Sequence, residues 1–269
     1  MEADPNAAVA SYPLVSLLPV LRTFEPPAGA FNPAGPWRQT WGVYTFAGRT
    51  AVTGRVGRLT LQRQVNGAAA RLEVTYSKEL TGGREEVTGT LEGPADAPLA
   101  TPDRWTFRIR LLDAQGNPVP HTDITRKAVR DGGQITISDP SETRRLAVPG
   151  PYTVNWCLFD AVQRLPGEDT KPLAFTLIDH ADQVKPETTL AFRKAMDVQV
   201  AGGKTVRTRA YEQLGRGNVP WVYWTDEAGR LLWVVAGLEG YALEAAGESA
   251  AKHAPAPYGS SQNRDKAGG

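Results

Sequence analysis

The sequence is poor in the residue types from which metal centres and many catalytic sites are built. Its 269 residues include one cysteine and three histidines. An internal disulfide and a Cys-only zinc site are therefore excluded, and a His-rich metal centre has little to draw on, so we expect no metal or cofactor. An excess of either charge is also missing, since 30 Lys and Arg face 29 Asp and Glu. A general nucleic-acid binder needs a strong basic excess, so we expect no nucleic-acid partner.

Long apolar runs are absent as well. No window approaches the roughly 18 apolar residues that a membrane-spanning helix requires, so the sequence predicts no membrane span. The start, Met1 to Asn6, has neither the basic region nor the apolar stretch of a signal peptide. Its acidic, proline-bearing composition suits the N-terminus of a mature periplasmic or secreted protein, and the cytoplasm stays open as the alternative.

The common enzyme signatures are also lacking. The sequence has no Gly-x-Ser-x-Gly elbow, P-loop, His-Glu-x-x-His or Gly-x-Gly-x-x-Gly motif. These absences remove the familiar hydrolases, nucleotide enzymes and zinc proteases. They leave enzymatic activity uncertain, and we favour a non-enzymatic protein.

Short runs of aromatic and β-branched residues, separated by turns, are abundant instead. Trp37 to Phe46 ends at a small-residue turn, and in 104–112 the apolar side chains alternate with polar ones. Asp131-Gly132-Gly133 predicts a hairpin turn. Turn residues recur every 8 to 12 positions or so, which is typical of antiparallel β proteins. Further strands are expected at 55–65, 71–78, 84–91, 124–130, 134–138, 173–178, 190–200, 204–213, 218–225, 230–236 and 238–243.

The chain divides into three parts by composition. Residues 1–36 are rich in Pro, Ala and Gly and predict an irregular N-terminal arm. Residues 37–243 form a single β-rich domain in this interpretation. Residues 244–269 lack periodicity and predict a disordered tail.

One segment breaks the β pattern. Between Tyr152 and Leu165, apolar residues recur in steps of three and one, which is the stripe of an amphipathic helix. Proline and glycine at 149–151 and 166–167 mark its ends. A single apolar helix in a β chain usually covers a curved sheet. We therefore predict a mainly β fold, in which a curved antiparallel sheet or half-barrel is wrapped around one central α-helix near 152–165.

Two segments carry a resemblance to a known family. Trp156 to Pro166, with Phe-Asp-Ala at its centre, and Pro220 to Ala236, with Tyr-Trp-x-Asp-x-x-Gly-Arg-Leu-Leu, resemble bacterial envelope proteins of the DUF3108 type, whose function is uncharacterised. That group resembles lipoprotein-carrier half-barrels. The resemblance covers roughly 150–243, and it extends over 37–148 only by strand count. It implies an extracytoplasmic half-barrel and assigns no catalytic residues.

The aromatic residues are the best candidates for a binding site. In the strand at 218–225, Trp221 and Tyr223 share a face and Trp224 points to the other. Tryptophan and tyrosine combine an apolar body with a polar edge that suits ligand sites. The simpler alternative is that these rings pack against the helix; the sharper hypothesis is an aromatic-lined cleft or a stacking platform for sugars. The candidate ligand-binding residues are Trp41, Trp105, Phe107, Trp156, Phe159, Trp221, Tyr223 and Trp233.

Three polar features have structural explanations beside functional ones. The segment Asp179 to Asp182 surrounds His180 with acids, and we favour a turn over a metal or acid–base site. Cys157, in the apolar stripe, is expected to be an inert core residue. Asp160 and Arg164 have the i,i+4 spacing of a solvated helix ion pair, which we favour over a buried carboxylate with a partner.

These observations favour a non-enzymatic extracytoplasmic protein that binds an apolar or amphipathic ligand, or a partner segment, in a groove between sheet and helix. The expected partner is a lipid, another hydrophobic small molecule or a protein segment. A carbohydrate-active enzyme with a carboxylate pair is the first alternative. A structural module that pairs through an exposed strand edge is the second.

Overall fold

The computed structural model describes residues 13–47, 52–148, 150–169, 171–179 and 182–245. These residues form a mainly β protein, as the sequence predicted. The strands are β1 (Trp37–Phe46), β2 (Val52–Asn66), β3 (Ala69–Leu80), β4 (Gly83–Pro94), β5 (Arg104–Asp113), β6 (Ile124–Asp131), β7 (Gln134–Ser138), β8 (Thr143–Ala147), β9 (Tyr152–Val154), β10 (Leu173–Asp179), β11 (Gln183–Gln199), β12 (Thr205–Leu214), β13 (Trp221–Asp226), β14 (Leu231–Ala236) and β15 (Glu239–Leu243). The helical segments are α2 (Leu18–Leu21), α3 (Cys157–Ala161) and the 3₁₀ turns η1 (Pro13–Leu17), η2 (Val162–Arg164), η3 (Gly167–Asp169) and η4 (Ala201–Gly203).

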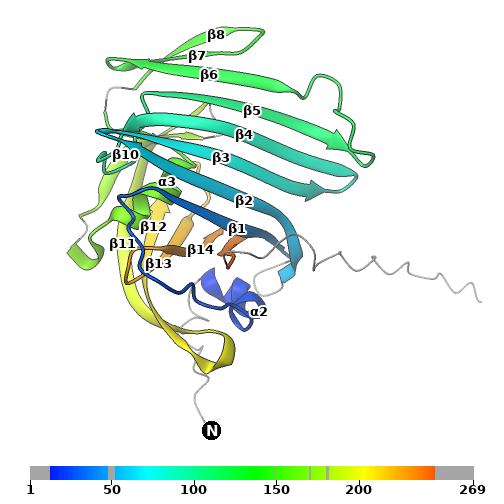
Figure 1. The fold of residues 1–269 in the computed structure, drawn as a ribbon. Helices are drawn as coiled ribbons and strands as arrows, with labels where there is room; N and C mark the ends of the chain where they lie inside the picture. Colours follow the sequence, from blue (N-terminus) through cyan, green and yellow to red (C-terminus); the bar gives the residue numbers. More distant parts are fainter. Residues whose placement is uncertain (1–12, 48–51, 149, 170, 180–181, 246–269) are drawn as a thin grey trace, which may run out of the picture.

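All fifteen strands belong to one sheet. Their order is β8-β7-β6-β5-β4-β3-β2-β1-β15-β14-β13-β12-β11-β10-β9, and the pairs are antiparallel except for β9 with β10. The pairing of β1 with β15, in which Trp41 lies opposite Leu243, joins the early strands to the late ones. The two end strands, β8 and β9, do not pair, so the sheet stays open. Figure 1 shows it bending so that the late strands lie across from the early ones.

The alternation of side chains along the strands places the core as expected. In β5, Trp105 and Phe107 are buried while Arg108 is exposed. The hairpin predicted at Asp131-Gly132-Gly133 joins β6 to β7, and Gly132 has a φ of +57°. That backbone conformation favours glycine because it lacks a Cβ.

The prediction of one helix over 152–165 is wrong in its length and in the secondary structure of its first residues. Tyr152–Val154 is β9, and only Cys157–Ala161 is α-helical, followed by the 3₁₀ turn η2. The short strand forms because its backbone pairs with Thr176, Leu177 and Ile178 of β10. All five α3 residues are buried, which explains the apolar pattern without a long helix. The sheet therefore has two short helices beside it rather than one long central helix.

The N-terminal arm is more ordered than its composition suggested. Within 13–36, η1 and α2 bury Leu14, Leu17 and Leu21. Phe24 lies edge-on to Trp233 of β14, with ring centroids 4.9 Å apart. Because the arm covers one face of β14, all six residues of that strand are buried. The predicted disordered tail lies, from residue 246 onward, outside the described residues.

Strand β11 begins seven residues earlier than predicted, at Gln183 instead of 190. Pro186 lies within this strand, although proline cannot donate a hydrogen bond to a neighbouring strand. The register with β10 shifts between Phe175 and Leu177, so Pro186 lies in an irregularity that requires no regular pairing. The neighbouring Glu187 adopts a φ of +56° in the same irregularity.

Candidate functional site

The sheet bends around a cavity of about 510 Å³. Strands β3, β4 and β5 supply one wall, and β13, β15 and the turns beside them supply another. These walls are brought together because the open sheet curves back on itself (Figure 1). The aromatic residues that line the cavity are Tyr76, Phe107, Trp156, Trp221, Tyr223 and Tyr241.

Three of these rings, Trp221, Tyr223 and Tyr241, stack against one another and are called the aromatic floor below. The Trp221 ring lies nearly parallel to Tyr223, at 22° with centroids 6.1 Å apart, and to Tyr241, at 24° and 6.0 Å. Behind them, Phe159 of α3 is fully buried and meets Tyr223 and Tyr241 edge-on, at 5.9 and 5.5 Å. Edge-to-face packing is a favourable arrangement for aromatic pairs. The helix therefore fixes the floor from below without occupying the cavity.

Charged side chains also line the same cavity. Lys78 of β3 forms an ion pair with Glu239 of β15, and Lys185 of β11 contacts Asp179 at 2.5 Å between Nζ and Oδ2. Glu85, directly opposite Lys78 in the β3–β4 ladder, adds a further carboxylate. An apolar floor with a charged edge suits an amphipathic molecule, because each part of the ligand meets a matching surface.

The tyrosine hydroxyls of the floor are engaged within the protein. The Tyr223 hydroxyl donates to Gln213 Oε1 at 2.8 Å, and the Tyr241 hydroxyl donates to Glu239 Oε2 at 3.0 Å. Burial, reinforced by neighbouring carboxylates, raises the pKa of both phenols well above the usual value. Both residues thus stay neutral, and their side chains are almost fully buried in the wall of the cavity, at 1% and 2% exposure.

The polar side chains of the lining are carboxylates, lysines, amides and phenols. The described residues that line the cavity include no serine, threonine, cysteine or histidine. Two of its three carboxylates are paired with lysines. Within the described ranges, no group of three or more His, Cys, Asp and Glu side chains could hold a metal ion. The aromatic rings and the paired charges are therefore the recognition elements that this cavity offers.

The eight residues predicted for ligand binding separate into two groups of four. Phe107, Trp156, Trp221 and Tyr223 line the cavity. Trp41, Trp105, Phe159 and Trp233 are buried in the core and do not line it; Phe107 and Tyr223 are equally buried, so Trp156 and Trp221 are the partly exposed rings of the predicted set.

The core positions of this second group follow from their contacts. Trp41 donates its indole N–H to the carbonyl of Leu231 at 3.1 Å and lies against Phe159. Trp233 neighbours Val234, which lies opposite Tyr223 in the ladder. Because successive side chains alternate, Trp233 points to the face that Phe24 of the arm covers.

Tyr76 and Tyr241 are cavity residues that the sequence interpretation missed. Tyr76 continues the buried alternation of Leu72 and Val74 along β3. Tyr241 lies in register with both Val43 of β1 and Val234 of β14. Following the period of two to the ends of these strands would have placed Tyr76 and Tyr241 on the inner face. The Lys78–Glu239 ion pair had no such signal, since its partners are 161 residues apart.

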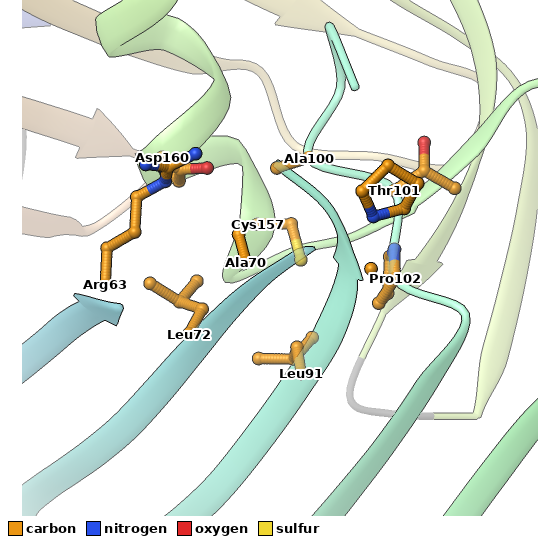
Figure 2. Close-up of a pocket in the computed structure, with 11 residues that line it drawn as sticks. Arg63, Ala70, Leu72, Leu91, Ala100, Thr101, Pro102, Cys157 and Asp160 are labelled. Carbon is orange, nitrogen blue, oxygen red and sulfur yellow. The ribbon is translucent and has the colours of Figure 1, made fainter. Parts of the chain in front are cut away.

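Asp160 is not the solvated residue that the sequence favoured. It is 4% exposed, and its two carboxylate oxygens lie 3.1 Å from Arg63 Nε and 3.0 Å from Arg164 Nη2. Figure 2 shows Arg63 reaching from the end of β2 to Asp160 on α3. Burial raises the pKa of Asp160, and the guanidinium charges of Arg164 and Arg63 oppose that rise. The alternative of a buried carboxylate with partners is therefore correct.

This buried cluster fastens α3 to the loops around it. Arg63 Nη1 donates to Gly35 O at 2.9 Å, and Arg63 Nη2 donates to Ala95 O at 2.7 Å. Arg164 Nη1 donates to Ala97 O at 2.9 Å. An adjoining cavity of about 20 Å³, beside Asp160 and the buried Cys157, has room for about one water molecule. The cluster thus holds the helix beneath the aromatic floor.

Cys157 is an inert core residue, as predicted. Its side chain is buried, and burial raises the pKa of its thiol, which keeps it from forming a reactive thiolate at neutral pH. Of the acidic segment around residue 180, His180 lies outside the described residues. Asp179 pairs with Lys185, and Asp182 pairs with Arg144 at 2.6 Å, so both acids have structural partners.

A second hollow of about 470 Å³ lies on the arm side of β1. Three of its charged residues have partners in the protein, since Glu244 pairs with Arg58 at 3.0 Å and Arg230 donates to Pro27 O at 3.0 Å. It lacks the stacked rings of the larger cavity. The larger cavity is therefore the better candidate for a ligand site.

Comparisons with known proteins support the fold alone. No protein-family model and no curated protein matches the sequence. The DUF3108 resemblance accordingly remains a prediction. Among solved structures, the chain is similar to a β-barrel-like protein of the domain of unknown function DUF1849 from Brucella abortus, with a TM-score of 0.51 and 13% identity over 78% of this chain and 96% of that one. A DUF1089 family protein from Pseudomonas aeruginosa also matches, with a TM-score of 0.35 and 13% identity over 78% of this chain and 94% of that one. The part of the chain that the structure describes has no helix of the length and hydrophobicity that crossing a bilayer requires.

Proposed function

We propose that the protein binds one apolar or amphipathic small molecule in the cavity between the early and late strands. The observation that carries the proposal is the stacked floor of Trp221, Tyr223 and Tyr241 in a cavity of about 510 Å³. Small-molecule sites are commonly concave, lined mainly by apolar and aromatic groups, and about 300–1,000 Å³ in volume. The binding is non-enzymatic and takes place outside the cytoplasm, in keeping with the envelope resemblance.

In this proposal α3 and the curved sheet act together as a half-barrel with a buried plug. Phe159 braces the floor, so the apolar part of the ligand lies on the rings and not against the helix. A polar head would lie at the edge formed by the Lys78–Glu239 and Lys185–Asp179 pairs. A free lipid or another hydrophobic small molecule fits this division of the surface better than a polar sugar does.

The test is a fluorescence titration with N-phenyl-1-naphthylamine, an uncharged apolar probe that brightens when it leaves water. The variant Ile109→Trp places an indole in the cavity, because Ile109 lies on the inner face of β5 and lines it. The control variant Thr106→Trp carries the same side chain on the opposite face of the same strand.

We expect saturable binding by the wild-type protein and by Thr106→Trp, and affinity at least about tenfold weaker for Ile109→Trp, a difference of about 1.4 kcal/mol. Circular dichroism of each variant verifies that the fold is kept. Equal affinity of the wild-type protein and Ile109→Trp would place the binding elsewhere. An absence of saturable binding by the wild-type protein would refute the proposed function.

A further inference from the structure

Exposed aliphatic side chains gather at the mouth of the cavity. Among the described large hydrophobic residues, four are more than 40% exposed: Leu238 at 62%, Val219 at 55%, Val129 at 55% and Leu80 at 42%. Val219 and Leu238 line the cavity themselves. Leu80 follows the cavity-lining Lys78 by two residues and so lies on the same face of β3. Only Val129, on β6, lies away from the mouth.

Two of the three mouth residues lie in turns, and the third ends a strand. Val219 lies between β12 and β13, and Leu238 lies between β14 and β15. These two turns touch, since a Cβ on Gly237 would lie 3.0 Å from Val219 Cγ1. Leu80 ends β3, whose Lys78 pairs with Glu239 beside Leu238. The name apolar lip is used below for Leu80, Val219 and Leu238.

The size of the apolar lip argues against a protein partner. A stable protein interface buries about 800 Å² on each side and involves about 20–30 residues of each partner. Three aliphatic side chains, two in turns and one at a strand end, fall far short of that. A fluid lipid surface imposes no such requirement, because each aliphatic side chain that enters it leaves water independently and contributes separately.

The charges of the mouth favour neutral over anionic lipids. Lys78 and Lys185 are both paired with carboxylates, and Glu85 adds a negative charge beside them. Binding to anionic lipid depends on clusters of basic residues near the membrane surface. The mouth has no such cluster among its described residues.

We propose that the apolar lip docks the mouth of the cavity on the surface of a bilayer of zwitterionic lipids. The inference rests on the proposed function for its purpose, since docking would open the cavity toward the phase in which an apolar ligand dissolves. The contact is peripheral and reversible, because it involves three side chains.

The test is flotation of the protein with phosphatidylcholine vesicles. The double variant Val219→Ser/Leu238→Ser removes the two most exposed parts of the lip. The matched control is Val129→Ser, since Val129 and Val219 are equally exposed. We expect the wild-type protein and Val129→Ser to float with the vesicles, and the double variant to lose at least about tenfold in partition coefficient.

Further measurements separate the possible outcomes. The proposal expects that adding phosphatidylglycerol to the vesicles does not strengthen binding and that binding persists at high salt. Three results would overturn it: no flotation of the wild-type protein, an equal loss in Val129→Ser, or binding that needs phosphatidylglycerol and disappears with salt. A concentration-dependent dimer in light scattering that the double variant abolishes would identify a second copy as the occupant and overturn it too.

The probe titration keeps this inference distinct from the proposed function. Leu80→Ser changes the one lip residue that does not line the cavity, so it should weaken vesicle binding and still bind N-phenyl-1-naphthylamine in the absence of vesicles. Wild-type protein that binds the probe but not vesicles would refute docking alone. Wild-type protein that fails to bind the probe would refute the ligand-binding function, whatever the vesicles show.

Discussion

Replacing Phe159 by alanine tests whether α3 braces the cavity floor. Phe159 is fully buried, and its ring meets Trp41, Tyr223 and Tyr241 edge-on with centroids 5.5–5.9 Å apart. Removing a buried phenyl ring costs the transfer free energy of the ring and leaves a cavity, about 3–5 kcal/mol in total. For a protein of this size each kcal/mol lowers Tm by about 2–4 °C, so the melting temperature should fall by about 6–20 °C.

Thermal unfolding followed by circular dichroism measures this effect. Phe192, a half-buried ring on β11, is the control because it lies outside the floor and contacts Tyr211 at 5.9 Å. Phe192→Ala should lower the free energy of unfolding by less than half as much. Phe159→Leu, which keeps an apolar side chain of related size, should cost less than about 1.5 kcal/mol. A loss below about 1 kcal/mol for Phe159→Ala would show that the ring does not hold the floor.

Three further predictions concern buried ionisable side chains. Arg63→Ala should cost about 3–5 kcal/mol in urea unfolding, since it removes one of the two cations paired with the buried Asp160; a cost near zero would contradict the ion-pair geometry. The pKa of Tyr223 and of Tyr241 is raised in the folded protein, so their contribution to the free energy of unfolding is complete below about pH 10 and declines at higher pH. Unfolding curves recorded between pH 9 and 12 measure this decline. A free energy of unfolding that rises over this range would contradict the prediction. Cys157 should react with a thiol reagent only in denaturant, and fast reaction of the native protein would contradict its burial.

Local patterns were enough to predict most of the strands. The alternation in 104–112 and the hairpin at Asp131-Gly132-Gly133 depend on neighbouring residues, so the sequence carries them directly. The apolar pattern between Tyr152 and Leu165 led to the wrong prediction of one long helix, because short apolar runs in a strand and in a helix look alike in the sequence. What decided between them was the pairing of β9 with β10, which depends on residues more than 20 positions away.

The candidate site was predictable only in part, for the same reason. Trp221 and Tyr223 share a face by their spacing of two, and they do line the cavity. Trp233 is equally apolar, but the face it occupies is covered by Phe24 of the arm, some 200 residues earlier. Burial of both faces of a strand makes inner and outer residues look the same in the sequence. The pairing of β1 with β15, which creates the cavity, likewise joins segments from opposite ends of the domain.

The most direct test of the ligand-binding account is native mass spectrometry of the purified protein after incubation with a total lipid extract. The account predicts one bound apolar or amphipathic molecule per chain in the wild-type protein and in Thr106→Trp. Ile109→Trp, in which the larger indole occupies part of the cavity, should show at least about tenfold less of the adduct. A bare mass for the wild-type protein, or the same adduct on all three proteins, would contradict the claim that this cavity is a ligand site.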